Sequence, residues 1–303
     1  MQEWARHPIF WSIMIILLGL TVLTPLQLIT VHIAMVPIVM IAALAPKLPM
    51  AAVYIAAPAM LLMLLSGPAW PITAIVMAVM FVPGAAMGYM YRRGANAVAS
   101  ITAGVVGMIA VLLAILVSLT LAGINIQAEI RNMIMEQFQL FTQITGNPLF
   151  SEEALDAAIS VAVRLLPLYI MVIAFYYAVI THVIARRLLN KLGVPAKAMP
   201  PVREWRLPKS LVWYYLAVLI LELFTPVESG FYTLLLNVYP ILLITFMVQG
   251  LAFYFAWAYY KGRSRALPIA AIVLCLLFPP AMQITSLVGL IDTAFPIRKF
   301  ANR

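Results

Sequence analysis

The chain has 303 residues, of which 65% are hydrophobic and only 10% are charged. Roughly a quarter of the residues of a soluble domain are charged, so this composition excludes a soluble protein and predicts a polytopic membrane protein. The net charge is +9. Because no soluble segment carries a basic stripe with interleaved aromatic residues, we assign this excess to cytoplasmic loops and expect no nucleic-acid partner.

The predicted elements are membrane-spanning helices, which makes the expected fold an all-α transmembrane bundle. Each span requires about 20 mainly apolar residues. The first apolar segment is expected to be a retained span, because no small-x-small cleavage site follows it. Eight spans are predicted at residues 8–24, 27–45, 49–66, 70–91, 97–122, 160–186, 209–225 and 231–260.

The distribution of charges predicts the orientation of these spans. With the N-terminus inside, Lys47, Arg92, Arg93, the segment 186–209 and the segment 261–265 all fall on the cytoplasmic side. Lysine and arginine collect in cytoplasmic loops of membrane proteins. We therefore expect both termini to be cytoplasmic.

The last apolar segment, 266–296, leaves two alternatives. A single crossing would place the basic tail that begins at Arg298 outside, whereas the double proline at 279–280 favours a broken hairpin that enters and returns. In the hairpin, Asp292 lies near the cytoplasmic interface and within reach of Arg298. This favours a boundary or pairing role for Asp292 over catalysis in the middle of the membrane, because an unpaired buried carboxylate is expensive.

An insert at 123–159 is the one sizeable extramembrane segment. Between Ile130 and Phe141 apolar residues recur at helical spacing with charged and amide residues between them, which predicts an amphipathic helix on the outer surface. A connector resting on lipid headgroups and a lid over an outward-facing pocket fit this pattern equally well.

Signatures of catalysis are absent from the sequence. There is no P-loop and no H-E-x-x-H motif, the three histidines are scattered, and Cys275 is the single cysteine. We expect no enzyme activity, no catalytic residue, no metal site and no cofactor.

Polar side chains within the spans are the candidate functional residues, because such groups usually pair or line a cavity. Arg164 and Glu222 are predicted to lie in the outer leaflet, either as an ion pair that locks two helices or as polar walls of a binding pocket. The predicted substrate-binding residues are Arg164, Glu222, Asn237, His32 and Gln27. Small residues at four-residue spacing, such as Gly84 and Gly88 or Ala103 and Gly107, predict close packing among the third, fourth and fifth spans.

Three stretches, at 203–216, 247–257 and 289–299, resemble the YybS-type family of predicted bacterial inner-membrane proteins. The resemblance covers nearly the whole length, and it implies a multi-pass protein of the bacterial cytoplasmic membrane without implying an activity. Its most specific parts are the loop that ends in Trp205-Arg206-Leu207-Pro208, the Gln249-Gly250 pair and the closing pattern of Gly289, Asp292 and Arg298. We expect structural or interface roles for Asp292, Arg298, Gln249, Trp205 and Arg206.

The first five spans, 1–122, resemble more distantly the substrate-binding S components of energy-coupling-factor vitamin transporters. The stretch 36–67 stands where those proteins have a Pro- and Ala-rich helical hairpin. This resemblance implies a binder of a small solute that is open to the outside. The first span contains no alanine between residues 9 and 23, and so departs from the alanine-spaced face through which S components dock to their coupling subunit.

The predicted organisation is a single transmembrane domain over 1–303, made of the first five spans, the insert 123–159 and the C-terminal spans 160–303. The expected partners are the lipid bilayer and an unknown small solute. An alternative function is a scaffold or assembly factor that docks a membrane or cytoplasmic protein through the basic loop 187–208. This loop also fits a lipid contact or a simple topology anchor.

Overall fold

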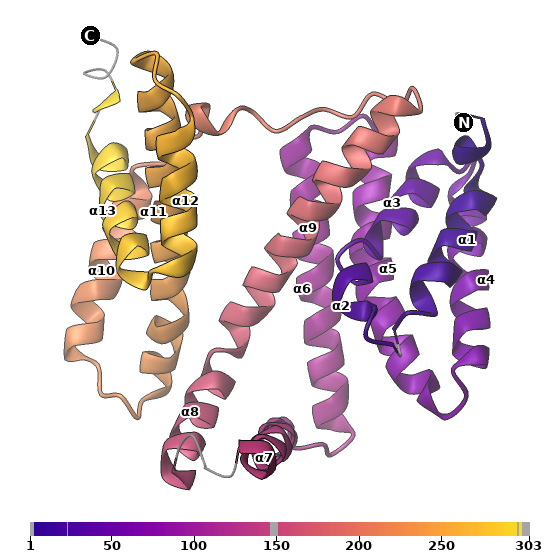
Figure 1. The fold of residues 1–303 in the computed structure, drawn as a ribbon, viewed down its shortest axis with the longest axis horizontal. Coiled ribbons are helices and arrows are strands. Elements are labelled where there is room, and N and C mark those ends of the chain that lie inside the picture. The colour runs from indigo at the N-terminus through magenta and orange to yellow at the C-terminus, as the bar shows by residue number, and fades with distance from the viewer. Residues whose placement is uncertain (1–2, 23, 146–150, 296, 299–303) are drawn as a thin grey trace. The chain divides into compact units, whose positions relative to one another are not determined.

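The computed structural model describes residues 3–22, 24–145, 151–295 and 297–298, and within them thirteen α-helices and no strand. This confirms the all-α class (Figure 1). The chain forms two compact units, of which the first comprises Met1–Ser151 and Tyr169–Met199 and the second comprises Glu152–Leu168 and Pro200–Arg303.

Helices lie at all eight predicted spans. Five of them are long and apolar enough to cross a membrane, namely α4 (Leu48–Leu65), α5 (Trp70–Arg92), α6 (Ala97–Leu121), α9 (Leu166–Lys191) and α11 (Gly230–Tyr260). Three others, α1 (Pro8–Gly19), α3 (Met35–Leu44) and α10 (Ser210–Phe224), are apolar but shorter than the roughly 17 residues of a full crossing. The chain is therefore built as a multi-pass membrane protein, and the count of eight crossings stays a prediction.

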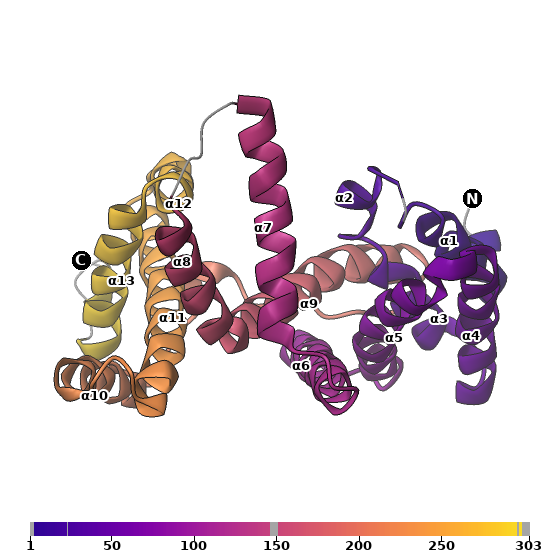
Figure 2. The same cartoon turned by 90° about the horizontal axis from the view of Figure 1, so that it is seen from below.

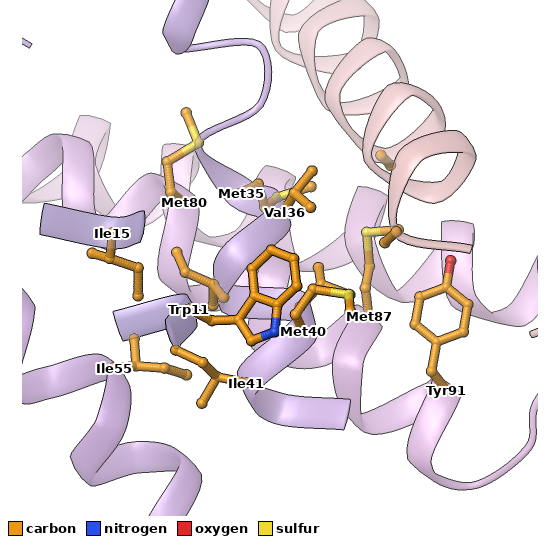
Figure 3. Packing of buried hydrophobic residues seen from close by; sticks show 14 of the residues in the cluster. Trp11, Ile15, Met35, Val36, Met40, Ile41, Ile55, Met80, Met87 and Tyr91 are labelled. Atoms are coloured by element: carbon orange, nitrogen blue, oxygen red, sulfur yellow. The ribbon is translucent and has the colours of Figure 1, made fainter. Parts of the chain in front are cut away.

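Helix α3 is the centre of the first unit. It packs against α1, α4 and α5, and all its residues from Met35 to Ala42 are buried. A helix that is apolar all round belongs in a core, because it has no polar face to show to solvent. Figure 3 shows side chains of the neighbouring helices around it, among them Trp11, Ile15, Ile55, Met80 and Met87.

Small residues bring α5 close to its neighbours, as their spacing predicts. A methyl group at Gly84 would lie 2.9 Å from Cγ2 of Ile38, and one at Gly88 would lie 2.7 Å from the carbonyl oxygen of Val39. Both glycines therefore face α3, the second predicted span, whereas their spacing predicted packing only among the third, fourth and fifth spans. Gly107 of α6 lies against Pro83 of α5, where a methyl group would be 3.0 Å from its Cα.

The predicted amphipathic helix is α7 (Ile126–Thr145), which belongs to the first unit. It runs across the direction of α6, as the end-on view in Figure 1 and the full-length view in Figure 2 show. Apolar side chains remain uncovered on it, with Met133 60% and Ile144 84% exposed. The end of the predicted insert, from Glu152 onward, lies in α8 (Glu152–Arg164) of the second unit, so the insert is divided between the two units.

The second unit is built on two hairpins. Helices α10 and α11 are joined by a short loop whose last residue, Ser229, caps α11 by accepting a hydrogen bond from the backbone N–H of Tyr232 at 3.0 Å. Helices α12 (Ala266–Leu277) and α13 (Pro279–Ala294) form the second hairpin, which turns at Phe278 and returns to the end where it began (Figure 1). With 12 residues α12 is about 18 Å long, far less than the roughly 30 Å of hydrocarbon. The predicted break at the double proline is confirmed.

Candidate functional site

Helices α11 and α13 cross with their backbones in contact. A methyl group at Gly289 would meet the carbonyl oxygen of Phe246 and lie 2.6 Å from the backbone nitrogen of Gly250. A methyl group at Gly250 would in turn meet the carbonyl oxygen of Thr285. Because no side chain separates the helices here, polar groups beside the crossing are brought within hydrogen-bonding distance.

A buried ion pair lies next to this crossing. Asp292 of α13 accepts hydrogen bonds from Nε of Arg298 at 2.9 and 3.0 Å, from Nη2 of Arg298 at 2.6 Å and from Nε2 of Gln249 at 2.6 Å. The side chain of Asp292 is 2% exposed and that of Arg298 is 6% exposed. The pairing of Asp292 with Arg298 that the sequence predicts is thus present.

Arg298 also binds the basic loop to this network. Its Nη1 donates to the carbonyl oxygen of Arg203 at 2.7 Å, within the 3-10 helix η3 (Val202–Glu204). The three stretches that carry the family resemblance therefore meet at one place, although 30 or more residues separate each from the next along the chain. We name this place the motif junction, comprising Gln249, Asp292, Arg298 and the backbone of Arg203.

A cavity of about 200 Å³ lies at the motif junction. The side chains of Arg206 and Lys209, both exposed residues, have no hydrogen-bond or ion-pair partner among the described residues. Since Arg298 already compensates the charge of Asp292, these two cations leave the lining positive, which raises the local concentration of anions. The cavity is lined by Arg206, Leu207, Lys209, Gln249, Asp292, Thr293, Phe295 and Arg298.

Sequence reasoning found Arg206, Gln249, Asp292 and Arg298 of this site but missed Lys209. The signal for Lys209 was available, because it directly follows the Arg206-Leu207-Pro208 stretch of the resemblance. The remaining predicted interface residue, Trp205, donates from Nε1 to the carbonyl oxygen of Pro200 at 2.8 Å and so folds the loop onto itself.

Asn237 repairs a break between α8 and α9. Pro167 lacks an N–H and its ring disfavours a continuous helix, so the helix is interrupted at Leu165. Oδ1 of Asn237 accepts from the N–H of Leu168 at 2.9 Å, and Nδ2 donates to the carbonyl oxygen of Arg164 at 2.8 Å. In an unbroken helix these two backbone groups would bond each other. The side chain of Asn237 is therefore inserted where that bond is missing.

Both N–H donors of Asn237 are in use, since Nδ2 also donates to the carbonyl oxygen of Thr233 at 2.8 Å. We expect Asn237→Leu to lower the free energy of unfolding by about 1–3 kcal/mol, because it leaves buried backbone groups unpaired. Chemical unfolding in detergent micelles measures this change. The same substitution in a Pro167→Ala background should be less harmful, because the helix can then close its own bond. An equal loss in both backgrounds would contradict this role.

The ion pair between Arg164 and Glu222, one of the two predicted alternatives, is not formed, although both residues are described in the structure. Arg164 lies at the end of α8, not within the sixth span, because the break at Pro167 starts that span only at Leu166. Its Nη1 donates instead to the carbonyl oxygen of Val227 at 3.1 Å, in the loop between α10 and α11.

The two other predicted binding residues belong to the first unit. His32 contacts two tyrosines of α9, and its Nδ1 lies 3.1 Å from the hydroxyl of Tyr176. Gln27 lines a separate cavity of about 60 Å³ with mostly apolar neighbours. Arg164, Glu222 and Asn237 belong to the second unit, so the predicted gathering of all five residues in one pocket stays a prediction.

Comparison with known proteins gives the family. The chain is 26% identical over 223 residues to the uncharacterized protein YybS of Bacillus subtilis (strain 168), a match that covers 71% of this chain and 72% of YybS. No solved structure matches. A family model described as "Predicted membrane protein (DUF2232)" matches residues 12–293. Because this match covers most of the chain, including Gln249 and Asp292 of the motif junction, the chain belongs to the DUF2232 family of predicted membrane proteins.

Proposed function

We propose that this integral membrane protein binds a small anionic solute in the cavity at the motif junction. The observation that carries the proposal is the pair of unpartnered cations, Arg206 and Lys209, beside a carboxylate that is already neutralised. The cavity of about 200 Å³ is smaller than the 300–1,000 Å³ of typical sites for drug-sized ligands, which favours a small solute.

The residues around the cavity suit a carboxylate or phosphate group. A guanidinium such as that of Arg206 offers parallel N–H donors to two oxygens of such a group, and the ammonium of Lys209 adds a point charge. The Asp292–Arg298 pair behind them holds Gln249 in place through the bond of 2.6 Å between Nε2 and Asp292. Under the predicted orientation this cavity opens at the cytoplasmic side.

The proposed function, binding of a small solute, is the one that the resemblance to S components implies. The proposed site is the cavity at the motif junction instead of an outward-facing pocket. An outward pocket walled by Arg164, Glu222 and Asn237 receives little support, because Arg164 is bonded to Val227 and Asn237 has no free donor. We propose binding from the cavity, whereas transport of the solute is proposed only from the resemblance to S components.

The test is native mass spectrometry of protein extracted directly from membranes. Wild-type protein should carry a bound low-mass anion, and the double variant Arg206→Gln with Lys209→Gln should have lost it. Each lost charged hydrogen bond is expected to weaken binding at least about tenfold. Lys261→Gln is the matched control, because Lys261 lies at the same end of the second unit but lines neither this cavity nor the one described below.

A stoichiometric protein partner in place of the anion would overturn the proposal and favour the scaffold function. The loop 187–208 is folded rather than free for such a partner. Asn190 makes two hydrogen bonds with the backbone of Ala196, at 2.8 and 3.1 Å, and Trp205 is bonded to Pro200. These internal bonds favour the solute over the scaffold.

A further inference from the structure

The second unit contains another basic cavity, made of different residues from the first. Its volume is about 270 Å³, and its wall combines three arginines with an apolar side and contains no acidic residue. It lies between the end of α11, the loop that leads to α12 and the segment around η3. Its lining consists of Pro201, Val202, Arg203, Phe255, Ala258, Tyr259, Arg263 and Arg265.

The local backbone fixes two of these arginines. Gly262 follows α11 with φ +60°, a conformation that favours glycine, and lets the chain fold back so that the N–H of Arg263 bonds the carbonyl oxygen of Ala258 at 2.8 Å. The guanidinium of Arg203 lies 4.0 Å from the ring centroid of Tyr259, in a cation–π contact. The cavity is therefore held in shape by helix α11 itself.

The sequence of α11 is typical of a helix whose end lies at the depth of lipid headgroups. Its 31 residues make it about 46 Å long, which exceeds the hydrocarbon thickness of about 30 Å. Aromatic residues concentrate in its last turns, as is typical of the membrane–water interface. They are Phe253, Tyr254, Phe255, Trp257, Tyr259 and Tyr260, and the basic residues Lys261, Arg263 and Arg265 follow them.

We propose that this cavity binds the headgroup of an anionic phospholipid. The guanidinium groups of Arg263 and Arg265 meet the phosphate oxygens, for which arginine forks are well suited, while Phe255 and Val202 cover the adjoining glycerol and first methylene groups. A zwitterionic headgroup carries its own cation, which Arg263 and Arg265 repel. The site shares no residue with the cavity at the motif junction, so each of the two proposals can fail without the other.

The experiment titrates full-length protein in detergent micelles with phosphatidylglycerol or phosphatidylcholine and counts bound lipid by native mass spectrometry. Wild-type protein should bind phosphatidylglycerol more tightly than phosphatidylcholine. The double variant Arg263→Gln with Arg265→Gln should bind phosphatidylglycerol at least about tenfold more weakly, with phosphatidylcholine unchanged. The variants Arg263→Lys and Arg265→Lys keep the positive charge and so control for a folding defect. They should retain only part of the preference for phosphatidylglycerol over phosphatidylcholine, because lysine lacks the arginine fork.

Three results would overturn the proposal. Equal binding of the two lipids by wild-type protein would exclude an anionic headgroup site. Non-specific electrostatic attraction between a basic residue and an anionic lipid surface strengthens binding about fivefold per residue. If Lys261→Gln weakened phosphatidylglycerol binding as much as Arg263→Gln or Arg265→Gln alone, a defined cavity site would be excluded. Displacement of phosphatidylglycerol by inorganic phosphate would identify a free anion, not a lipid, as the ligand.

Discussion

Asp292→Asn is expected to lower the free energy of unfolding by about 3–5 kcal/mol. The substitution keeps the shape of the side chain but leaves the guanidinium of Arg298 buried without a counter-charge, at 6% exposure. It also removes the charge that holds Gln249. Equilibrium unfolding in mixed detergent micelles, followed by tryptophan fluorescence, measures the change.

Two further variants separate charge from packing in this result. A double variant, Asp292→Leu with Arg298→Met, should regain most of the loss, because buried ion pairs are often replaceable by apolar groups of similar volume. Glu204→Gln is the surface control, since Glu204 pairs with Arg203 only at 3.8 Å and with its side chain 56% exposed. It should change stability by less than about 1 kcal/mol. An Asp292→Asn protein as stable as wild type would contradict the assigned pairing.

Gly289→Ala is expected to lower the free energy of unfolding by about 3 kcal/mol or more. Its methyl group would press on backbone atoms of α11, at Phe246 and Gly250, and backbone cannot rotate out of the way as a side chain can. Helix α13 must then move off α11, which also separates Gln249 from Asp292. Thermal unfolding and the anion occupancy of the same sample should therefore fall together.

Gly230→Ala provides the matched control for this substitution. Gly230 is the first residue of α11, and a methyl group there would meet nothing within 4 Å. Since alanine is the better helix former by up to about 1 kcal/mol, this variant should be as stable as wild type or slightly more stable. A Gly289→Ala protein that behaved like Gly230→Ala would show that the two helices are not in backbone contact.

The sequence predicts those features that depend on neighbouring residues. The double proline at 279–280 disfavours a continuous helix, so the break between α12 and α13 could be inferred from it, whereas the preference for a hairpin also depended on the basic tail. Asp292 and Arg298 are six residues apart, and a carboxylate and a cation so close at the end of an apolar segment favour pairing. The amphipathic pattern of α7 likewise depends only on its own residues.

Contacts between residues far apart in the chain could not be predicted from local sequence patterns. Asn237 and Leu168 are 69 residues apart, and nothing in either local pattern shows that an amide side chain replaces a helical hydrogen bond. The hydropathy pattern assigns similar depths to the oppositely charged Arg164 and Glu222, yet Arg164 lies in α8 outside the sixth span and its guanidinium bonds a loop carbonyl group instead. Hydropathy gives the depth of a residue but not its position around the bundle.

The burial of α3 has a consequence for how this protein enters the bilayer. Its ten residues extend only about 15 Å, half of the hydrocarbon thickness, and its surface is covered by protein from Met35 to Ala42. Lipid therefore does not select this helix by its length or by contact with its side chains. Arg92 donates to the carbonyl oxygens of Ala45 and Pro46 at 2.6 Å each, which ties the end of α3 to α5. We therefore expect insertion of α3 to depend in part on α4 and α5, which are synthesised after it and pack against it.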